Sequence, residues 1–265
     1  MTPSLQSISD VDTGIEICDL RSTPAFFERP SHPHNLARNA EALRRLAHLF
    51  AKEPESILQE LVDLAVEYCC ADSAGVSLEV PTEEKFRWVA IAGSFASFLH
   101  GTTPRFYSPC GTCLDRGSPQ LYRVSKPYYD YLGIQAEPIT DGILIPWTAG
   151  NMRGTFWAVN HHSSVAFDKD DLALLESLAD FAAIAVRHQA HEAELLRQAE
   201  ISAAAAMANE LAHQINNPLQ SLTNTVFLAA QGGEQSKQFA AQAVRDLADL
   251  SARVRDLLNL PFTRS

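Results

Sequence analysis

The sequence of 265 residues lacks the features that mark membrane and nucleic-acid-binding proteins. No stretch approaches the roughly 18 uncharged apolar residues that span a bilayer. The N-terminus lacks the basic and then apolar pattern of a signal peptide. No run of Lys and Arg offers a basic stripe to a phosphate backbone, and the net charge is −11. We therefore expect a cytoplasmic protein with neither membrane nor nucleic acid among its partners.

Cysteine is scarce, with five in the chain, and this predicts reduced thiols rather than a disulfide framework. Cys110 and Cys113 form a Cys-Gly-Thr-Cys segment. Such a pair can ligate a metal, form a redox disulfide or attach a cofactor, but it cannot complete a four-ligand zinc site alone. The alternative is that both are small buried residues in a turn that begins at Ser108 and Pro109. The cofactor, if any, is not identified by the sequence.

The first half of the chain predicts an α+β domain. Residues 1–34 show no clear periodicity and are rich in proline, which predicts a flexible tail. Apolar residues at helical spacing predict helices over Asn35–Lys52 and from Pro54 to Val66. Five short runs rich in β-branched and aromatic residues then predict strands of an antiparallel sheet. These runs are SAGVSLEV, FRWVAIAG, QLYRV, GILIPW and GTFWAVNHH. His161 and His162 end the last run before a turn, so we expect both to be exposed.

The second half predicts a helical hairpin. A helix from Asp171 to about Gln231 is interrupted only by Pro218, and Gly232-Gly233 then marks a sharp turn. Both arms carry apolar residues in steps of three and four, and two such stripes cannot bury each other completely. We therefore predict a homodimer that forms a four-helix bundle. The stripes are Ala204, Ala208, Leu211, Ile215 and Leu222 in the first arm, and Ala240, Ala243, Leu247, Leu250, Val254 and Leu257 in the second.

A histidine occupies the outer face of the first arm. At 100° per residue, His213 lies ~200° from Leu211 and Ile215, whereas Asn217 shares its face one turn later. An exposed imidazole next to an amide is what a phosphate acceptor needs, because a partner must reach the ring nitrogen. The plainer alternative is a solvated surface histidine followed by an Asn-Asn-Pro helix stop.

The segment His213-Gln214-Ile215-Asn216-Asn217-Pro218-Leu219 resembles the phosphoacceptor motif of sensor histidine kinases, His-Glu-x-Asn-Asn-Pro-Leu. The resemblance implies His213 as the acceptor and Asn217 as the residue that positions water for dephosphorylation. Gln214 replaces the family's acidic neighbour, and glutamine cannot accept a proton at neutral pH. The sequence holds neither the ATP-binding domain nor a Gly-rich nucleotide loop. We therefore expect phosphate to come from a separate kinase or a response regulator, unless the chain is a truncated kinase.

The region 35–188 resembles a GAF domain, a small-molecule-sensing relative of the PAS fold, in its order of helices and strands. The similarity includes SPCGTCLDRGSPQLY and the helix that begins at Asp171. It implies a ligand held between the sheet and a cross-over segment, His100–Tyr128, which contains Cys110 and Cys113. Tyrosines lie near this pair in sequence. The bilin attachment patterns of phytochrome-type GAF domains are absent, so a light sensor is not expected.

Together these patterns predict a flexible tail at 1–34, a GAF sensor at 35–188, a helical linker at 189–202 and a dimerisation and phosphotransfer hairpin at 203–265. The expected function is two-component signalling, in which a small-molecule or redox signal controls phosphate exchange between His213 and a response regulator receiver domain or a kinase. Two alternatives stay open. One is a non-catalytic, degenerate kinase that binds a signalling partner, which Gln214 favours. The other is a redox or metal-dependent GAF enzyme that uses Cys110 and Cys113.

Overall fold

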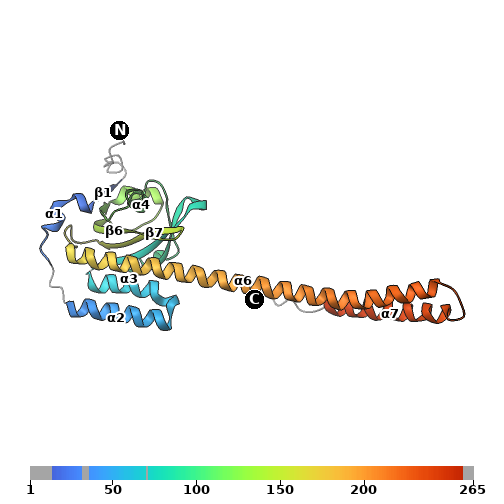
Figure 1. Ribbon diagram of the computed structural model, residues 1–265. Helices are drawn as coiled ribbons and strands as arrows, with labels where there is room; N and C mark the ends of the chain where they lie inside the picture. Colours follow the sequence, from blue (N-terminus) through green and yellow to red (C-terminus); the bar gives the residue numbers. More distant parts are fainter. Residues whose placement is uncertain (1–13, 32–35, 70, 259–265) are drawn as a thin grey trace. The chain divides into compact units, whose positions relative to one another are not determined.

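The computed structural model describes residues 14–31, 36–69 and 71–258, and the chain divides into two compact units between Glu192 and Ala193. The first unit contains a seven-stranded sheet in the order β1-β5-β6-β7-β2-β3-β4, in which every neighbouring pair is antiparallel (Figure 1). The strands are β1 (Ile15–Asp19), β2 (Ser73–Val80), β3 (Lys85–Gly93), β4 (Thr102–Pro104), β5 (Gln120–Val124), β6 (Ile139–Ala149) and β7 (Met152–Asn160). The predicted α+β class with an antiparallel sheet is confirmed.

Helices cover both faces of the sheet. One face packs against α2, α3 and the beginning of α6, and the opposite face carries α4 and α5 (Figure 1). Each face therefore has its own cluster of buried apolar side chains. The helices are α1 (Pro24–Phe27), α2 (Leu36–Lys52), α3 (Ile57–Tyr68), α4 (Pro109–Arg116), α5 (Lys126–Leu132), α6 (Lys169–Ala230) and α7 (Ser236–Leu258).

The N-terminal segment belongs to the sheet. Strand β1 pairs with β5, with Ile15 opposite Val124, and it buries Ile15 and Ile17 in the cluster on the α4 face. The prediction of a flexible tail is therefore wrong for residues 14–31, and the rest of 1–34 lies outside the described residues. This strand is not predictable from local sequence, because its partner lies about a hundred residues further along the chain.

A buried ion pair fixes the end of this segment. Arg29 contacts Asp141 of β6 at 2.8 Å, and the side chains are 10% and 0% exposed. Asp141 also accepts hydrogen bonds from the backbone N–H groups of Ala166 and Phe167, at 2.9 and 3.2 Å. Arg29 in turn donates to the carbonyl oxygen of Phe167 at 2.7 Å. The N-terminal segment, the sheet and the residues just before α6 are thus joined by one set of charge-assisted bonds.

Helix α6 begins with side-chain caps inside the first unit. Asp168 accepts hydrogen bonds from the backbone N–H groups of Asp170 and Asp171, and Asp171 accepts one from Asp168. Such reciprocal bonds satisfy the free donors of a helix start. The helix contains Pro218 and ends at Ala230, before Gly232. The predicted long helix and turn are confirmed, and no described helix is long and apolar enough to cross a membrane.

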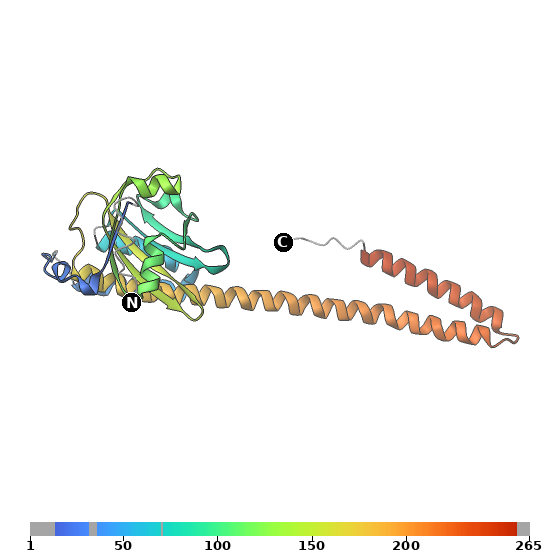
Figure 2. The same cartoon turned by 90° about the horizontal axis from the view of Figure 1, so that it is seen from above.

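The second unit contains the end of α6 and all of α7. Figure 2 shows α7 running back from the turn, with the two arms diverging away from it. Ser236 closes the turn by donating to the carbonyl oxygen of Ala229 at 2.5 Å. Ala243 and Leu250 are buried, whereas Leu211 and Leu247 of the predicted stripes are 37% and 52% exposed. The expected antiparallel hairpin is therefore present, and much of its apolar surface is uncovered within one chain.

Candidate functional site

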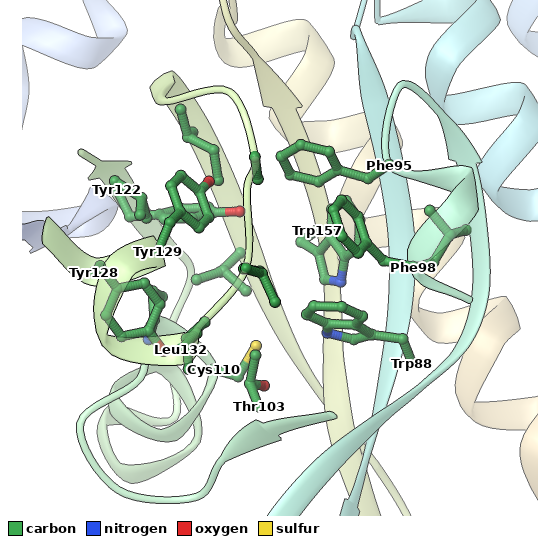
Figure 3. Close-up of a pocket in the computed structure, with 17 residues that line it drawn as sticks. Trp88, Phe95, Phe98, Thr103, Cys110, Tyr122, Tyr128, Tyr129, Leu132 and Trp157 are labelled. Atoms are coloured by element: carbon green, nitrogen blue, oxygen red, sulfur yellow. The ribbon is translucent and has the colours of Figure 1, made fainter. Parts of the chain in front are cut away.

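A pocket opens on the sheet face that carries α4 and α5 (Figure 3). It encloses about 610 Å³ of space free of atoms, its open mouth included. Its walls come from β3, β5, β6, β7 and the segments between them: Trp88, Ile91, Phe95, Phe98, Thr103, Pro109, Cys110, Tyr122, Val124, Tyr128, Tyr129, Leu132, Ile134, Ala136, Ile139, Leu144 and Trp157.

Two aromatic groups face each other across this pocket. Figure 3 shows Trp88, Phe95, Phe98 and Trp157 on one side, and Tyr122, Tyr128 and Tyr129 on the other. The first group packs edge to face, with the Phe98 ring 5.7 Å from that of Phe95 and 6.2 Å from that of Trp88. These ring contacts fix the positions of Phe95, Phe98 and Trp88 relative to one another.

Two strand glycines make room for the pocket rings. Gly75 of β2 lies opposite Trp157 in the strand register, and a Cβ at Gly75 would overlap the indole. Gly142 of β6 lies opposite Tyr122, and a Cβ there would come within 2.6 Å of the Tyr122 ring. Glycine within a strand often marks such a close approach. The two aromatic side chains can therefore lie close against the sheet where they line the pocket.

The Cys-Gly-Thr-Cys segment forms half of α4. Ser108 caps the helix by accepting a hydrogen bond from the backbone N–H of Gly111 at 3.1 Å, and Gly117 ends it with φ +63°. A Cβ at Gly111 would overlap the carbonyl oxygen of Arg105, so only glycine allows this close packing. The segment predicted as a turn is therefore a short helix.

Cys110 and Cys113 point to different partners. Cys110 lines the pocket, and its Sγ lies 3.9 Å from the Ser77 hydroxyl. The Sγ of Cys113 lies 3.6 Å from the carbonyl oxygen of Ser118 and 3.7 Å from that of Leu144. Both thiols are free, and burial raises the pKa of each. Since metal binding and disulfide exchange need thiolates, this environment disfavours both.

The described residues contain no group of three or more His, Cys, Asp or Glu side chains that could hold a metal ion. The predicted cofactor role of Cys110 and Cys113 stays a prediction. Cys110 is the member of the pair that a pocket ligand would touch.

Three buried hydroxyls beside the pocket lack hydrogen-bond partners. The hydroxyl oxygens of Thr103, Tyr128 and Tyr129 contact no donor or acceptor among the described residues. These residues are only 5–7% exposed. Burial raises the pKa of both tyrosines, so their hydroxyls keep their protons and can donate. An unpaired buried polar group costs about 1–3 kcal/mol, and this cost would be relieved by a ligand with a suitable acceptor.

His161 is buried and joins two loops at the edge of the pocket. It is 8% exposed, which corrects the expectation of an exposed side chain, whereas His162 is exposed as expected. Its Nδ1 lies 2.9 Å from the Pro138 carbonyl oxygen, and its Nε2 lies 2.9 Å from the Ser94 hydroxyl. Because a carbonyl oxygen can only accept, Nδ1 carries a proton and donates it to the Pro138 carbonyl. The ring thus ties together the chain segments that carry Phe95 and Ile139.

The predicted phosphoacceptor residues lie on α6 in the second unit. His213, Gln214 and Asn217 are all exposed. The side-chain amide of Gln214 donates to the Glu210 carboxylate at 2.9 Å. The Gln214 side chain is therefore hydrogen-bonded to Glu210, one turn earlier on the same helix. The imidazole of His213 is open to solvent.

The structure brings together some of the expected residues and adds others. Cys110 shares the pocket with Tyr122, Tyr128 and Tyr129, whereas Cys113 lies outside its walls. Tyr107 and Tyr131, which are also near the cysteines in sequence, are exposed. The aromatic group opposite was missed, although FRW and TFW carry two of its members in predicted strands. Its members are Trp88, Phe95, Phe98 and Trp157.

The fold is an α+β domain with a pocket on one face of its sheet. The GAF domain family model matches residues 51–187, just over half of the chain, and the chain therefore belongs to the GAF domain family. This confirms the resemblance of the first half. The matched residues do not include the hairpin that carries His213.

Two solved structures can be compared with this chain by identity, coverage and TM-score. The GAF domain of a phosphoenolpyruvate-protein phosphotransferase from Coxiella burnetii is similar, with 16% identity and a TM-score of 0.50, over 60% of this chain and 99% of that one. The second GAF domain of DevS from Mycobacterium smegmatis gives 19% identity and a TM-score of 0.43, over 54% and 99% of the two chains. At such identities the first likeness shows the fold alone. No curated protein matches the chain.

Proposed function

We propose that this chain is a cytoplasmic two-component signalling protein whose GAF pocket controls phosphate exchange at His213. The observation that carries the proposal is the position of His213 on α6. This helix packs Leu174, Leu175 and Leu178 into the GAF core near its beginning and carries an exposed His213 near its end. One helix therefore contributes to both the sensing domain and the candidate phosphate acceptor.

The surroundings of His213 suit a phosphate acceptor. The imidazole is exposed, and Asn217 lies on the same helix face, one turn later. An amide there can hold a water molecule against a phosphorylated ring. Gln214 cannot act as a base, but it donates to Glu210, whose carboxylate lies one turn before His213. Glu210 is thus the acidic group that this helix offers in place of the acid found in the family motif.

The hairpin is the surface through which we expect the chain to dimerise. Val244 and Leu247 of α7 are 69% and 52% exposed, and Phe227 of α6 is 64% exposed. Apolar stripes on two helices are commonly buried when two hairpins form a four-helix bundle. A second copy of this chain supplies the matching stripes. In such a bundle the outer face with His213 stays open to a receiver domain or to a separate kinase.

Signal transfer would begin at the pocket. A ligand that changes the packing of the sheet would change how α6 packs against the GAF core. A shift or rotation of that helix would then alter access to His213.

The proposal is tested by labelling the purified chain with radioactive ATP in a lysate of its native cells. We expect acid-labile phosphate on the wild type and none on His213→Ala. His191→Ala is the matched control, because His191 is an exposed histidine on the same helix. It should be labelled like the wild type.

A second function follows from Gln214, which removes the general base expected beside the acceptor. The chain would then be a non-catalytic regulator that binds a signalling partner through its hairpin. An unlabelled wild type, in a lysate that labels another histidine protein, would reject phosphate exchange and favour this second function.

A further inference from the structure

We propose that the GAF pocket binds an uncharged aromatic molecule that carries a hydrogen-bond acceptor such as a carbonyl oxygen. The inference rests on the proposed function, because it takes this pocket as the input of the sensor. It concerns the chemistry of the ligand, which neither the family nor the fold determines.

The walls exclude a charged ligand. None of the seventeen lining residues in the described part of the chain is charged. Arg105 follows the lining residue Thr103 by two positions in the chain, but its guanidinium contacts the carboxylates of Glu79 and Asp115. A carboxylate or an ammonium group moved from water into such a cavity would lose its hydration without gaining a counter-charge. The occupant is therefore neutral.

The shape of the walls favours an aromatic ligand. Trp88, Phe95, Phe98 and Trp157 face Tyr122, Tyr128 and Tyr129 across the open space (Figure 3). Rings on two opposed sides offer both faces and edges, so a flat ring between them can stack or pack edge to face. A flexible aliphatic chain would fill the same space without these ring contacts.

The unpaired hydroxyls place the acceptor. Tyr128 and Tyr129 lie on the short helix α5, and their hydroxyls have no partner among the described residues. Both keep their protons, because burial raises the pKa of each phenol. Thr103 supplies a third unpaired hydroxyl from β4. A carbonyl oxygen in the pocket can accept a hydrogen bond from such a donor.

Cys110 does not form a covalent bond to this ligand. Its thiol is buried in the pocket wall, and burial raises its pKa, so the reactive thiolate is scarce at neutral pH. We therefore expect reversible binding in which Cys110 contributes only an apolar contact.

The test uses three probes of similar size: acetophenone, which is neutral and has an acceptor; ethylbenzene, which has none; and benzoate, which is an anion. The full-length chain is titrated while the indole N–H signals of its three tryptophans are followed by NMR. Trp88 and Trp157 line the pocket, whereas Trp147 belongs to the other core cluster and serves as an internal reference.

We expect acetophenone to shift the Trp88 and Trp157 signals to saturation and to leave Trp147 in place. The double variant Tyr128→Phe/Tyr129→Phe should weaken acetophenone binding about tenfold, because the ring contacts remain and the donors are lost. Ethylbenzene should bind the wild type and the double variant equally, and benzoate should not saturate. Tyr131→Phe is the matched control, since Tyr131 lies on the same helix and is 65% exposed.

Three results would overturn the inference. They are benzoate binding as tightly as acetophenone, equal acetophenone affinities in the wild type and the double variant, and the absence of saturable shifts at Trp88 and Trp157 with acetophenone. The readout does not involve phosphate. If the chain binds acetophenone as described but is not labelled at His213, this inference stands and the proposed function is rejected. If it is labelled at His213 but does not bind acetophenone, the proposed function stands and this inference is rejected.

Discussion

The two units of this chain differ in how completely they bury their apolar residues. In the GAF unit, Phe86, Phe156 and Phe167 are fully buried. In the hairpin, Phe227, Val244 and Leu247 are each more than half exposed. Since burial of apolar surface is the main stabilising contribution to folding, the GAF unit has a core of its own, and the hairpin gains most from a partner. The GAF unit thus has a complete apolar core, whereas the hairpin leaves much of its apolar surface exposed.

Charged groups show the same difference. Inside the GAF unit, Glu79 is buried and contacts both Arg105 and Arg153, which joins β2 and β7 to the segment before α4. In the hairpin unit, Arg197 and Glu194 form a pair whose side chains are 61% and 44% exposed. Buried pairs fix one arrangement of the chain, and exposed pairs contribute little. The buried pairs therefore constrain the packing of the GAF unit, whereas the exposed pair constrains the hairpin unit little.

The largest effect on this comparison is expected from breaking the Arg29–Asp141 pair. Arg29→Met leaves the buried Asp141 carboxylate without its counter-charge. We expect the GAF unit to lose about 3 kcal/mol of unfolding free energy and its melting temperature to fall by about 10 °C. Thermal unfolding followed by tryptophan fluorescence measures this unit, because Trp88, Trp147 and Trp157 all lie within it.

Lys126→Met is the control for this variant. Lys126 pairs with Asp130, but the side chains are 77% and 59% exposed. Its loss should change stability by no more than about 0.5 kcal/mol. Equal effects of the two substitutions would show that the N-terminal segment is not fixed to the sheet in the way described.

The next largest effect is expected in the hairpin. Leu211→Glu places a charge in the apolar stripe, and Asn209→Glu places the same charge on the outer face. We expect the first substitution to raise the dissociation constant of the dimer about 100-fold and the second to leave it unchanged. Sedimentation equilibrium distinguishes a dimer from a single chain of 29.1 kDa. A monomeric wild type at micromolar concentration would reject the four-helix bundle.

The smallest effect is expected in the alkylation rates of the cysteines, which differ between the surface and the core. Cys18 is exposed, and Cys110 and Cys113 are buried with raised pKa values. A raised pKa leaves less thiolate at any pH below it, so alkylation of the buried pair should increase only at a more alkaline pH than that of an ordinary thiol. At pH 8 we expect Cys110 and Cys113 to react at least about tenfold more slowly than Cys18.

Peptide mapping after timed alkylation measures these rates, and the unfolded chain is the control in which the difference should vanish. Rapid native alkylation of Cys110 would revive a redox role for the Cys-Gly-Thr-Cys segment. Slow alkylation would leave Cys110 as an apolar part of the pocket wall.

Local patterns predicted the long elements well. The helical spacing of Leu174 and Leu178 and the turn at Gly232 give α6 and the hairpin, because each signal lies within a few residues of the element it defines. The same holds for β2, β3, β6 and β7, whose β-branched and aromatic runs are continuous. Helix α4 was missed although its Ser108 cap and Gly117 end are visible in the sequence, since its length of 8 residues gives little periodicity.

The pocket could be predicted only in part, because its two sides come from distant segments. Cys110 and Tyr128 lie in one cross-over segment, and that proximity identified them. The rings of Phe95 and Trp157 lie 6.3 Å apart. They are close because β3 and β7 both pair with β2 in the sheet, which the sequence alone does not show. The glycine opposite Trp157 is likewise meaningful only once the strand register is known.

The most direct test of the account is to locate phosphate on the chain isolated from its native cells, by mass spectrometry at neutral to alkaline pH, where phosphohistidine survives. The sequence has nine histidines, so the position of the phosphate is itself informative. We expect phosphate on His213 and on no other histidine. Phosphate on a different histidine, or none on His213 when another histidine protein of the same cells carries it, would contradict the account.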